Sequence, residues 1–135
     1  VRGGSIVGGQ GGMVRLDGSA EPIGPRALFV QLGSDGAGLT GNSRAAQWMI
    51  LDQLVDEARG RISADSGIAL LTPAGRQTFA RYLDGGGRVV VGVHRAADIR
   101  QLLRWSLRHG VRIAILGGGE AWMLAPQLAA AKVPV

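Results

Sequence analysis

His94 is the residue of this sequence best placed to do chemistry. It follows Arg88–Val93, a segment with four valines in five residues, and it comes directly before a helical pattern. The valines predict a short strand buried on both faces, so His94 lies where a strand becomes a helix. In α/β folds, ligands bind and reactions occur at the carboxyl ends of parallel strands. An imidazole there can be a metal ligand if other strands supply further ligands, and a hydrogen-bonded structural histidine is the alternative.

A second candidate feature is the triple glycine Gly117, Gly118 and Gly119, which Glu120 follows. The exposed N–H groups of such a turn before a helix can hold an anion. The alternative is a tight turn with an acidic residue in the first helical turn, because the Glu120 carboxylate would already occupy the positive helix end. With Arg95, which lies beside His94, these residues are the candidates for binding a ligand at one shared rim.

The elements that position these residues recur regularly. Strand 88–94, helix 96–109, strand 111–116, helix 120–131 and a new apolar segment at 133 follow one another at intervals of roughly 22–24 residues. Short βα units of this kind predict a parallel sheet with right-handed crossovers, and its strand-to-helix joints lie on one edge. We therefore expect His94 and the triple glycine at the same edge.

The first part of the chain is rich in glycine. Glycine pairs on both sides of Gln10 suggest a phosphate-binding loop, but a strand pattern follows them and no Gly-Lys-Ser/Thr is present. A hairpin or bulged turn within residues 1–18 is therefore predicted. Residues 21–25, with two prolines, are expected to form a loop, and residues 27–32 a buried strand.

Three helices are expected to have one apolar face each. Asn42 or Ser43 can cap a helix that runs to about residue 59, and Thr72 with Pro73 begins the next one. The acidic Asp52, Asp56 and Glu57 are expected on the exposed side of the first. In helix 96–109 the predicted apolar face consists of Ile99, Leu102, Leu103 and Leu107. His109 precedes Gly110 and is predicted to cap the end of that helix.

Length and composition limit the possible classes of protein. The 135 residues predict a single domain over 1–135. No cysteine is present, which excludes disulfides and thiolate metal sites. The formal net charge is +5, and all the basic residues except Lys132 are arginines. Because they are spread over every segment, we expect no nucleic-acid partner, and no apolar run predicts a membrane span.

Several segments together resemble a known family. Val89–Ile99, Ile113–Trp122 and Leu128–Val135 resemble a bacterial branch of the metal-dependent amidohydrolases that includes imidazolonepropionase and Xaa-Pro-dipeptidase-like enzymes. Gly9-Gln10 and the segment 38–45 are also similar to that branch, so the likeness covers most of the chain.

The resemblance implies an α/β fold of parallel βα repeats, a partial (β/α)8 TIM barrel preceded by a hairpin-like glycine-rich segment. It implies hydrolysis of amide or cyclic C–N bonds by water bound to zinc or another divalent metal, with His94 as a metal ligand. Gly117–Gly119 stand where the family normally has a second histidine, and its His-X-His and catalytic Asp have no counterpart here. The chain is thus expected to be a fragment of such a barrel, inactive by itself.

The same resemblance implies a small-molecule substrate and a bacterial cytoplasmic or periplasmic location. Open sheet edges would favour self-association or completion of the sheet by other chains. Two other hypotheses remain: a stand-alone α/β module that binds a small anion at its glycine-rich rim, and an oligomerising domain without a ligand.

Overall fold

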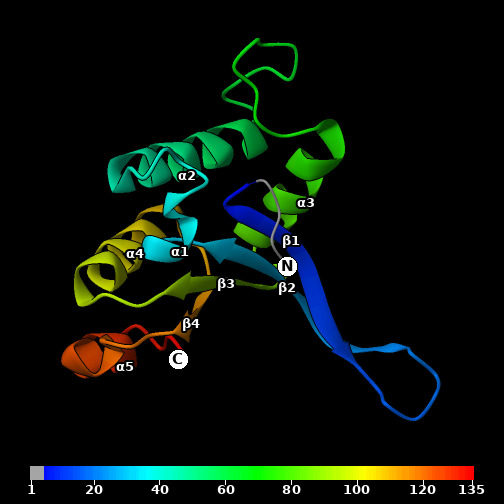
Figure 1. Ribbon diagram of the computed structural model, residues 1–135. Coiled ribbons are helices and arrows are strands. Elements are labelled where there is room, and N and C mark those ends of the chain that lie inside the picture. The colour runs from blue at the N-terminus through cyan, green and yellow to red at the C-terminus, as the bar shows by residue number, and fades with distance from the viewer. Residues whose placement is uncertain (1–4) are drawn as a thin grey trace.

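The computed structural model describes residues 5–135, which fold around one four-stranded sheet (Figure 1). The strands are β1 (Val7–Val14), β2 (Pro22–Gln31), β3 (Arg88–Val93) and β4 (Ile113–Gly117), in the order β1-β2-β3-β4. β1 is antiparallel to β2, whereas β2, β3 and β4 are parallel. The sheet is therefore mixed, and three of its carboxyl ends lie at one edge.

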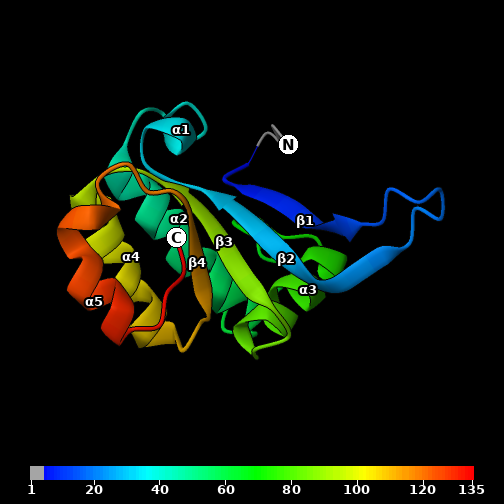
Figure 2. The same ribbon diagram turned by 90° about the horizontal axis from the view of Figure 1, so that it is seen from below.

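The helices lie between the parallel strands and after the last of them. They are α1 (Ser34–Ala37), α2 (Arg44–Ala58), α3 (Pro73–Leu83), α4 (Ala96–His109), the 3₁₀ helix η1 (Ala121–Leu124) and α5 (Ala125–Ala130). Figure 2 shows the sheet in front of α2, α3 and α4, so these helices cover one of its faces. None of the helices in residues 5–135 is both long and apolar enough to cross a membrane.

The helix ends follow from local sequence. The Ser43 hydroxyl accepts from Ala46 N–H at 3.2 Å, and the Thr72 hydroxyl accepts from Gly75 N–H at 3.1 Å, as predicted. Gly110 ends α4 with a φ of 68°. The predicted helix 120–131 is divided, because α5 begins only at Ala125 with Pro126 in its first turn.

The core lies between the sheet and its covering helices. Leu28, Val30, Val89 and Val91 point into it, and Phe79 of α3 packs there. On the other face of the parallel strands, Phe29, Val90 and Ala114 are half-buried, whereas Gly92 is buried. The prediction that strand 88–94 is buried on both faces is therefore confirmed only in part.

Helix α4 corrects another expectation. Leu107, predicted to face inward, is 86% exposed, whereas Trp105 is buried against the core at 3%. Ile99 and Leu102 are fully buried as expected. The buried side of α4 therefore includes Trp105 and not Leu107.

Two leucines of α4 give a direct stability test. We expect Leu102→Ala to lower the free energy of unfolding by about 2–5 kcal/mol, because it leaves a cavity in the core. Leu107→Ala removes the same atoms from an exposed site and should change stability by less than about 0.5 kcal/mol. Urea unfolding of both variants measures the difference, and equal losses would contradict this packing of α4.

The expected partial (β/α)8 barrel is wrong. The sheet is open, and its first strand is antiparallel to the rest. The regular spacing of βα units holds only from β3 onward, since three helices and a long loop separate β2 from β3. The parallel pairing of β3 with β4 is present, but two adjacent units of this kind do not determine a closed barrel.

The glycine-rich start is a strand that pairs with β2. Gln10 lies opposite Leu28 in the antiparallel ladder, and its Oε1 accepts from the Tyr82 hydroxyl at 3.3 Å. The phosphate-loop interpretation is therefore wrong for the described residues, and residues 1–4 of the predicted hairpin lie outside them. The expected loop 21–25 is also wrong, because Pro22 and Pro25 belong to β2. They precede the part of β2 that pairs with β3, so their missing N–H groups cost that ladder no hydrogen bond.

Candidate functional site

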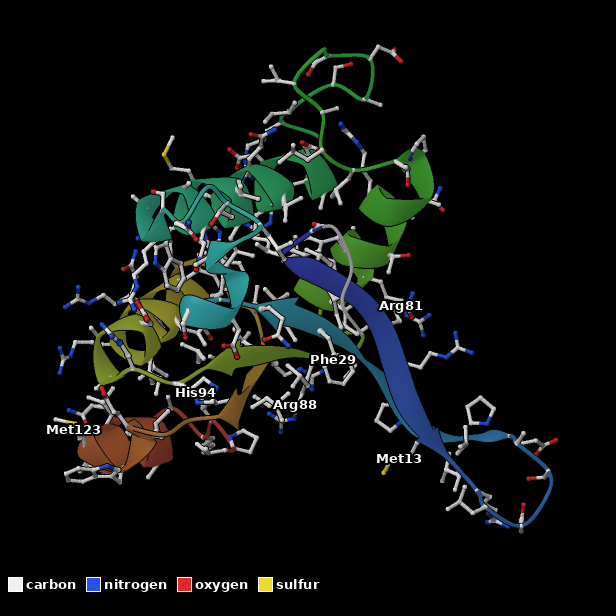
Figure 3. All side chains as sticks on the ribbon, viewed as in Figure 1. Met13, Phe29, Arg81, Arg88, His94 and Met123 are labelled. Carbon is white, nitrogen blue, oxygen red and sulfur yellow. The ribbon has the colours of Figure 1, made fainter. Side chains whose placement is uncertain are left out.

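Three strand-to-helix joints meet at the carboxyl edge of the parallel strands. Gly33–Asp35 follow β2, His94 and Arg95 follow β3, and Gly117–Glu120 follow β4. Val93 pairs with Gly117 in the parallel register, which brings the second and third joints side by side. Figure 3 shows His94 at this edge and Arg88 at the opposite end of β3.

His94 and Asp35 face each other across the edge. Nε2 of His94 lies 3.5 Å from Oδ2 of Asp35, and the two side chains are 49% and 54% exposed. Asp35 was not among the site residues predicted from the sequence. The signal was available, since Asp35 follows a buried strand in the same way as His94. A half-exposed imidazole beside a carboxylate can bind a ligand or transfer a proton.

Gly117 lies directly beside the His94 ring. It has a φ of +92°, and a Cβ at this position would overlap Cε1 of His94 and lie 2.9 Å from Nε2. A Cβ at Gly119 would lie 3.7 Å from Nδ1. Gly117 therefore leaves room for the imidazole as only a residue without a side chain can, whereas a Cβ at Gly119 would make an ordinary contact with the ring.

The backbone of the triple-glycine turn is bonded to the β3–α4 joint. Gly118 N–H donates to the Val93 carbonyl at 2.9 Å, and Glu120 N–H donates to the His94 carbonyl at 2.8 Å. The Glu120 carboxylate accepts from Ala96 N–H at 2.8 Å. The Gly118 N–H group, one of those proposed to hold an anion, is thus already used, and the Glu120 carboxylate occupies the start of α4, which argues against the anion-binding hypothesis.

Arg95 is the N-cap residue of α4 and is exposed. Its side chain makes no capping hydrogen bond, so the positive end of α4 is held by Glu120 instead.

A buried amide supports the joint that carries Asp35. Gln47 of α2 is 1% exposed; its Oε1 accepts from Gly33 N–H and its Nε2 donates to the Gly33 carbonyl, both at 2.8 Å. Nearby, the Asp98 carboxylate is nine-tenths buried with Oδ2 3.5 Å from Arg44. Gln47 was not singled out, because one amide in a helix carries no sequence signal.

We expect Gln47→Leu to lower the free energy of unfolding by about 2–4 kcal/mol, because it leaves the N–H and the carbonyl of Gly33 buried without partners. Gln101→Leu, on the exposed side of α4, is the comparison variant for the general effect of replacing an amide. Thermal and urea unfolding measure both. A loss for Gln47→Leu no larger than for Gln101→Leu would contradict the assigned role.

The second histidine lies elsewhere. His109 Nε2 is 3.1 Å from Oδ1 of Asp52 on α2, and its ring is 5.2 Å from that of Trp105. The His109 ring does not cap α4 as predicted; instead the Arg59 guanidinium donates to the His109 carbonyl at 2.7 Å. His109 thus joins two helices.

The fit of a metal to this edge can be judged from the donor set. Residues 5–135 contain no group of three or more His, Cys, Asp or Glu side chains placed to hold a metal ion. His94 and Asp35 offer one imidazole and one carboxylate, whereas catalytic zinc takes three protein ligands. These residues alone do not form a zinc centre.

Comparisons with known proteins bear on the fold. No family model matches the sequence, and no curated protein matches it. Among solved structures, an amidohydrolase from Thermotoga maritima MSB8 is similar, with a TM-score of 0.78 and 20% sequence identity. The similarity covers 96% of this chain and 38% of that protein. At this identity the likeness shows a shared fold, and the chain corresponds to less than half of the length of that amidohydrolase.

Proposed function

We propose that this chain is part of a hydrolase that acts on amide or cyclic C–N bonds of a small molecule. The observation that carries the proposal is the His94–Asp35 pair at the carboxyl edge of parallel strands, with the two side chains 3.5 Å apart and half-exposed. The fold shared with part of an amidohydrolase supports the same reaction class.

The proposed roles follow from the arrangement of the two side chains. The Asp35 carboxylate faces Nε2 and favours the tautomer with the proton on that nitrogen. Nδ1 is then free to accept a proton from a water molecule that adds to the substrate carbonyl carbon. As the C–N bond breaks, the same proton passes from the imidazolium to the leaving nitrogen. Asp35 stabilises the imidazolium in between.

A metal is not assigned any of these steps. Zinc or another divalent ion, which the family resemblance implies, would need ligands in addition to His94 and Asp35. We propose that such ligands, if the metal is used, come from outside the described residues.

The test is hydrolysis by the protein as its gene encodes it. Linear amides, lactams and cyclic imides are offered as substrates, and ring opening or amine release is followed, with and without added zinc. We expect turnover of at least one class, and loss of that turnover in His94→Ala at unchanged melting temperature. No turnover of any class, or equal turnover by His94→Ala, would overturn the proposal.

A further inference from the structure

We infer that Glu120 and Gly117 are positioning residues for His94 and do not bind the ligand themselves. The relevance of this inference to hydrolysis rests on the proposed function, but the geometry behind it does not. In this arrangement the joint after β4 fixes the side chain of His94, which follows the neighbouring strand β3.

Glu120 bonds to the main chain on both sides of Arg95. Its N–H donates to the His94 carbonyl, and its carboxylate accepts from Ala96 N–H, each at 2.8 Å. The Gly118 N–H bond to Val93, at 2.9 Å, adds a third contact just before His94. The backbone from Val93 to Ala96 is thereby held by hydrogen bonds from the joint after β4.

The carboxylate of Glu120 accepts a hydrogen bond from the first turn of α4, which in most helices is the role of the N-cap side chain. Arg95 occupies the N-cap position of α4 but contributes no side-chain bond, so the first N–H of the helix is satisfied by a residue of the joint after β4. A charged acceptor at a helix N-terminus is among the stronger hydrogen bonds. Because the acceptor lies on the β4 side, it also fixes where α4 begins relative to β4.

Gly117 sets the position of the ring itself. A side chain at this residue would overlap the His94 imidazole, and its φ of +92° is strained for any residue with a Cβ. With the backbone held by Glu120, the ring lies against the Gly117 Cα on one side and faces Asp35 through Nε2. Glu120 fixes the main chain of His94, and Gly117 leaves space for its side chain.

Nuclear magnetic resonance of the ¹³C,¹⁵N-labelled protein tests the inference without reference to any substrate. The wild type should show a cross-peak between the ε1 proton of His94 and the α protons of Gly117. In Glu120→Ala the cross-peak should be lost and the His94 ring resonances should move. Glu120→Gln keeps a side-chain oxygen acceptor for Ala96 N–H and should retain the cross-peak. His109 resonances serve as the internal control, because that ring contacts Asp52 and Trp105.

Two results would overturn the inference. One is a Glu120→Ala spectrum in which the His94 resonances and the cross-peak match the wild type. The other is a spectrum in which Glu120→Ala and Glu120→Gln change His94 equally, since the acceptor would then be irrelevant. Gly117→Ala should displace the ring as well; the Glu120 pair keeps the test decisive if that variant does not fold.

Kinetics then separate this inference from the proposed function. If hydrolysis is found, Glu120→Ala should lower kcat by about 10²-fold with little change in KM, as expected for a misplaced reacting group. If no hydrolysis is found while the resonance results hold, the proposed function fails and the positioning roles stand. If hydrolysis is found but the His94 resonances of Glu120→Ala match the wild type, the proposed function stands and the positioning roles fail.

Discussion

Replacing His94 by alanine is expected to lower kcat for amide or lactam hydrolysis by about 10²–10⁴-fold, the usual contribution of a positioned acid–base group. The ring is half-exposed and packs against a glycine, so its removal leaves no cavity in the core and should leave the fold intact. The KM should change little, because the proposed role of His94 lies in proton transfer. Steady-state kinetics with melting temperatures measured in parallel check this result.

Two further variants make the His94 result specific. Asp35→Asn should lower kcat by a smaller factor than His94→Ala, since it removes the charge that stabilises the imidazolium but keeps the base. His109→Gln is the matched control, because it replaces the other histidine, which lies between α2 and α4. We expect this control to lose stability and to keep its turnover. Equal loss of turnover in the two histidine variants would contradict an active edge at His94.

Replacing Glu57 by alanine is expected to lower the free energy of unfolding by about 3–5 kcal/mol, the range for breaking a buried ion pair. The side chain of Glu57 is fully buried, and its oxygens accept from Leu70 N–H at 2.8 Å and Leu71 N–H at 2.9 Å. Gln53 also donates to it at 3.0 Å, and Arg76 lies 3.4 Å away. The alanine variant leaves both N–H groups without their acceptor and removes the anion that faces the Arg76 guanidinium, which keeps its bonds to the carbonyls of Ile62 and Ser63.

The same carboxylate gives stability a dependence on pH. Burial by itself would raise the pKa of Glu57, but the N–H groups of Leu70 and Leu71, with Gln53 and Arg76, outweigh it and hold the pKa below the usual 4.5. Because the pKa is lower in the folded state, the stabilisation is present above pH 4.5 and is lost as the pH falls through the folded value.

Urea unfolding between pH 7 and pH 3 measures this dependence. The wild type should lose stability below about pH 4.5, and Glu57→Gln should show a shallower decrease because it has no carboxylate to protonate. Asp65→Asn, an exposed change in the loop that follows α2, is the control and should leave the slope unchanged. A slope for Glu57→Gln equal to that of the wild type would contradict the role of Glu57.

The sequence was informative where local chemistry decides structure. Ser43 and Thr72 start their helices as predicted, and the valines of 89–93 form a strand parallel to the next one, so His94 and the triple glycine share an edge. These features depend on residues close in the chain. A hydroxyl oxygen caps a helix that begins at the next residue, and branched side chains favour a strand at their own positions.

Features that depend on distant partners could not be predicted in this way. Glu57 was placed on the exposed face of its helix, yet the loop that ends at Leu71 returns to cover it. Gln47 and Asp35 acquire their roles only when β2, α2 and β3 are packed together. The partial barrel was expected from the family resemblance, whereas the arrangement of the sheet also depends on how the glycine-rich β1 pairs with β2.

The contact between Gly117 and His94 has a consequence for how substitutions combine. An alanine at 117 harms the protein partly by displacing an imidazole that is present, so the same change should be much milder once His94 is itself alanine. The effect of a substitution at 117 therefore depends on whether residue 94 is histidine. A lineage gains this histidine most easily when glycine already stands at 117, and once both are present, reversion at 117 is disfavoured until the imidazole is lost.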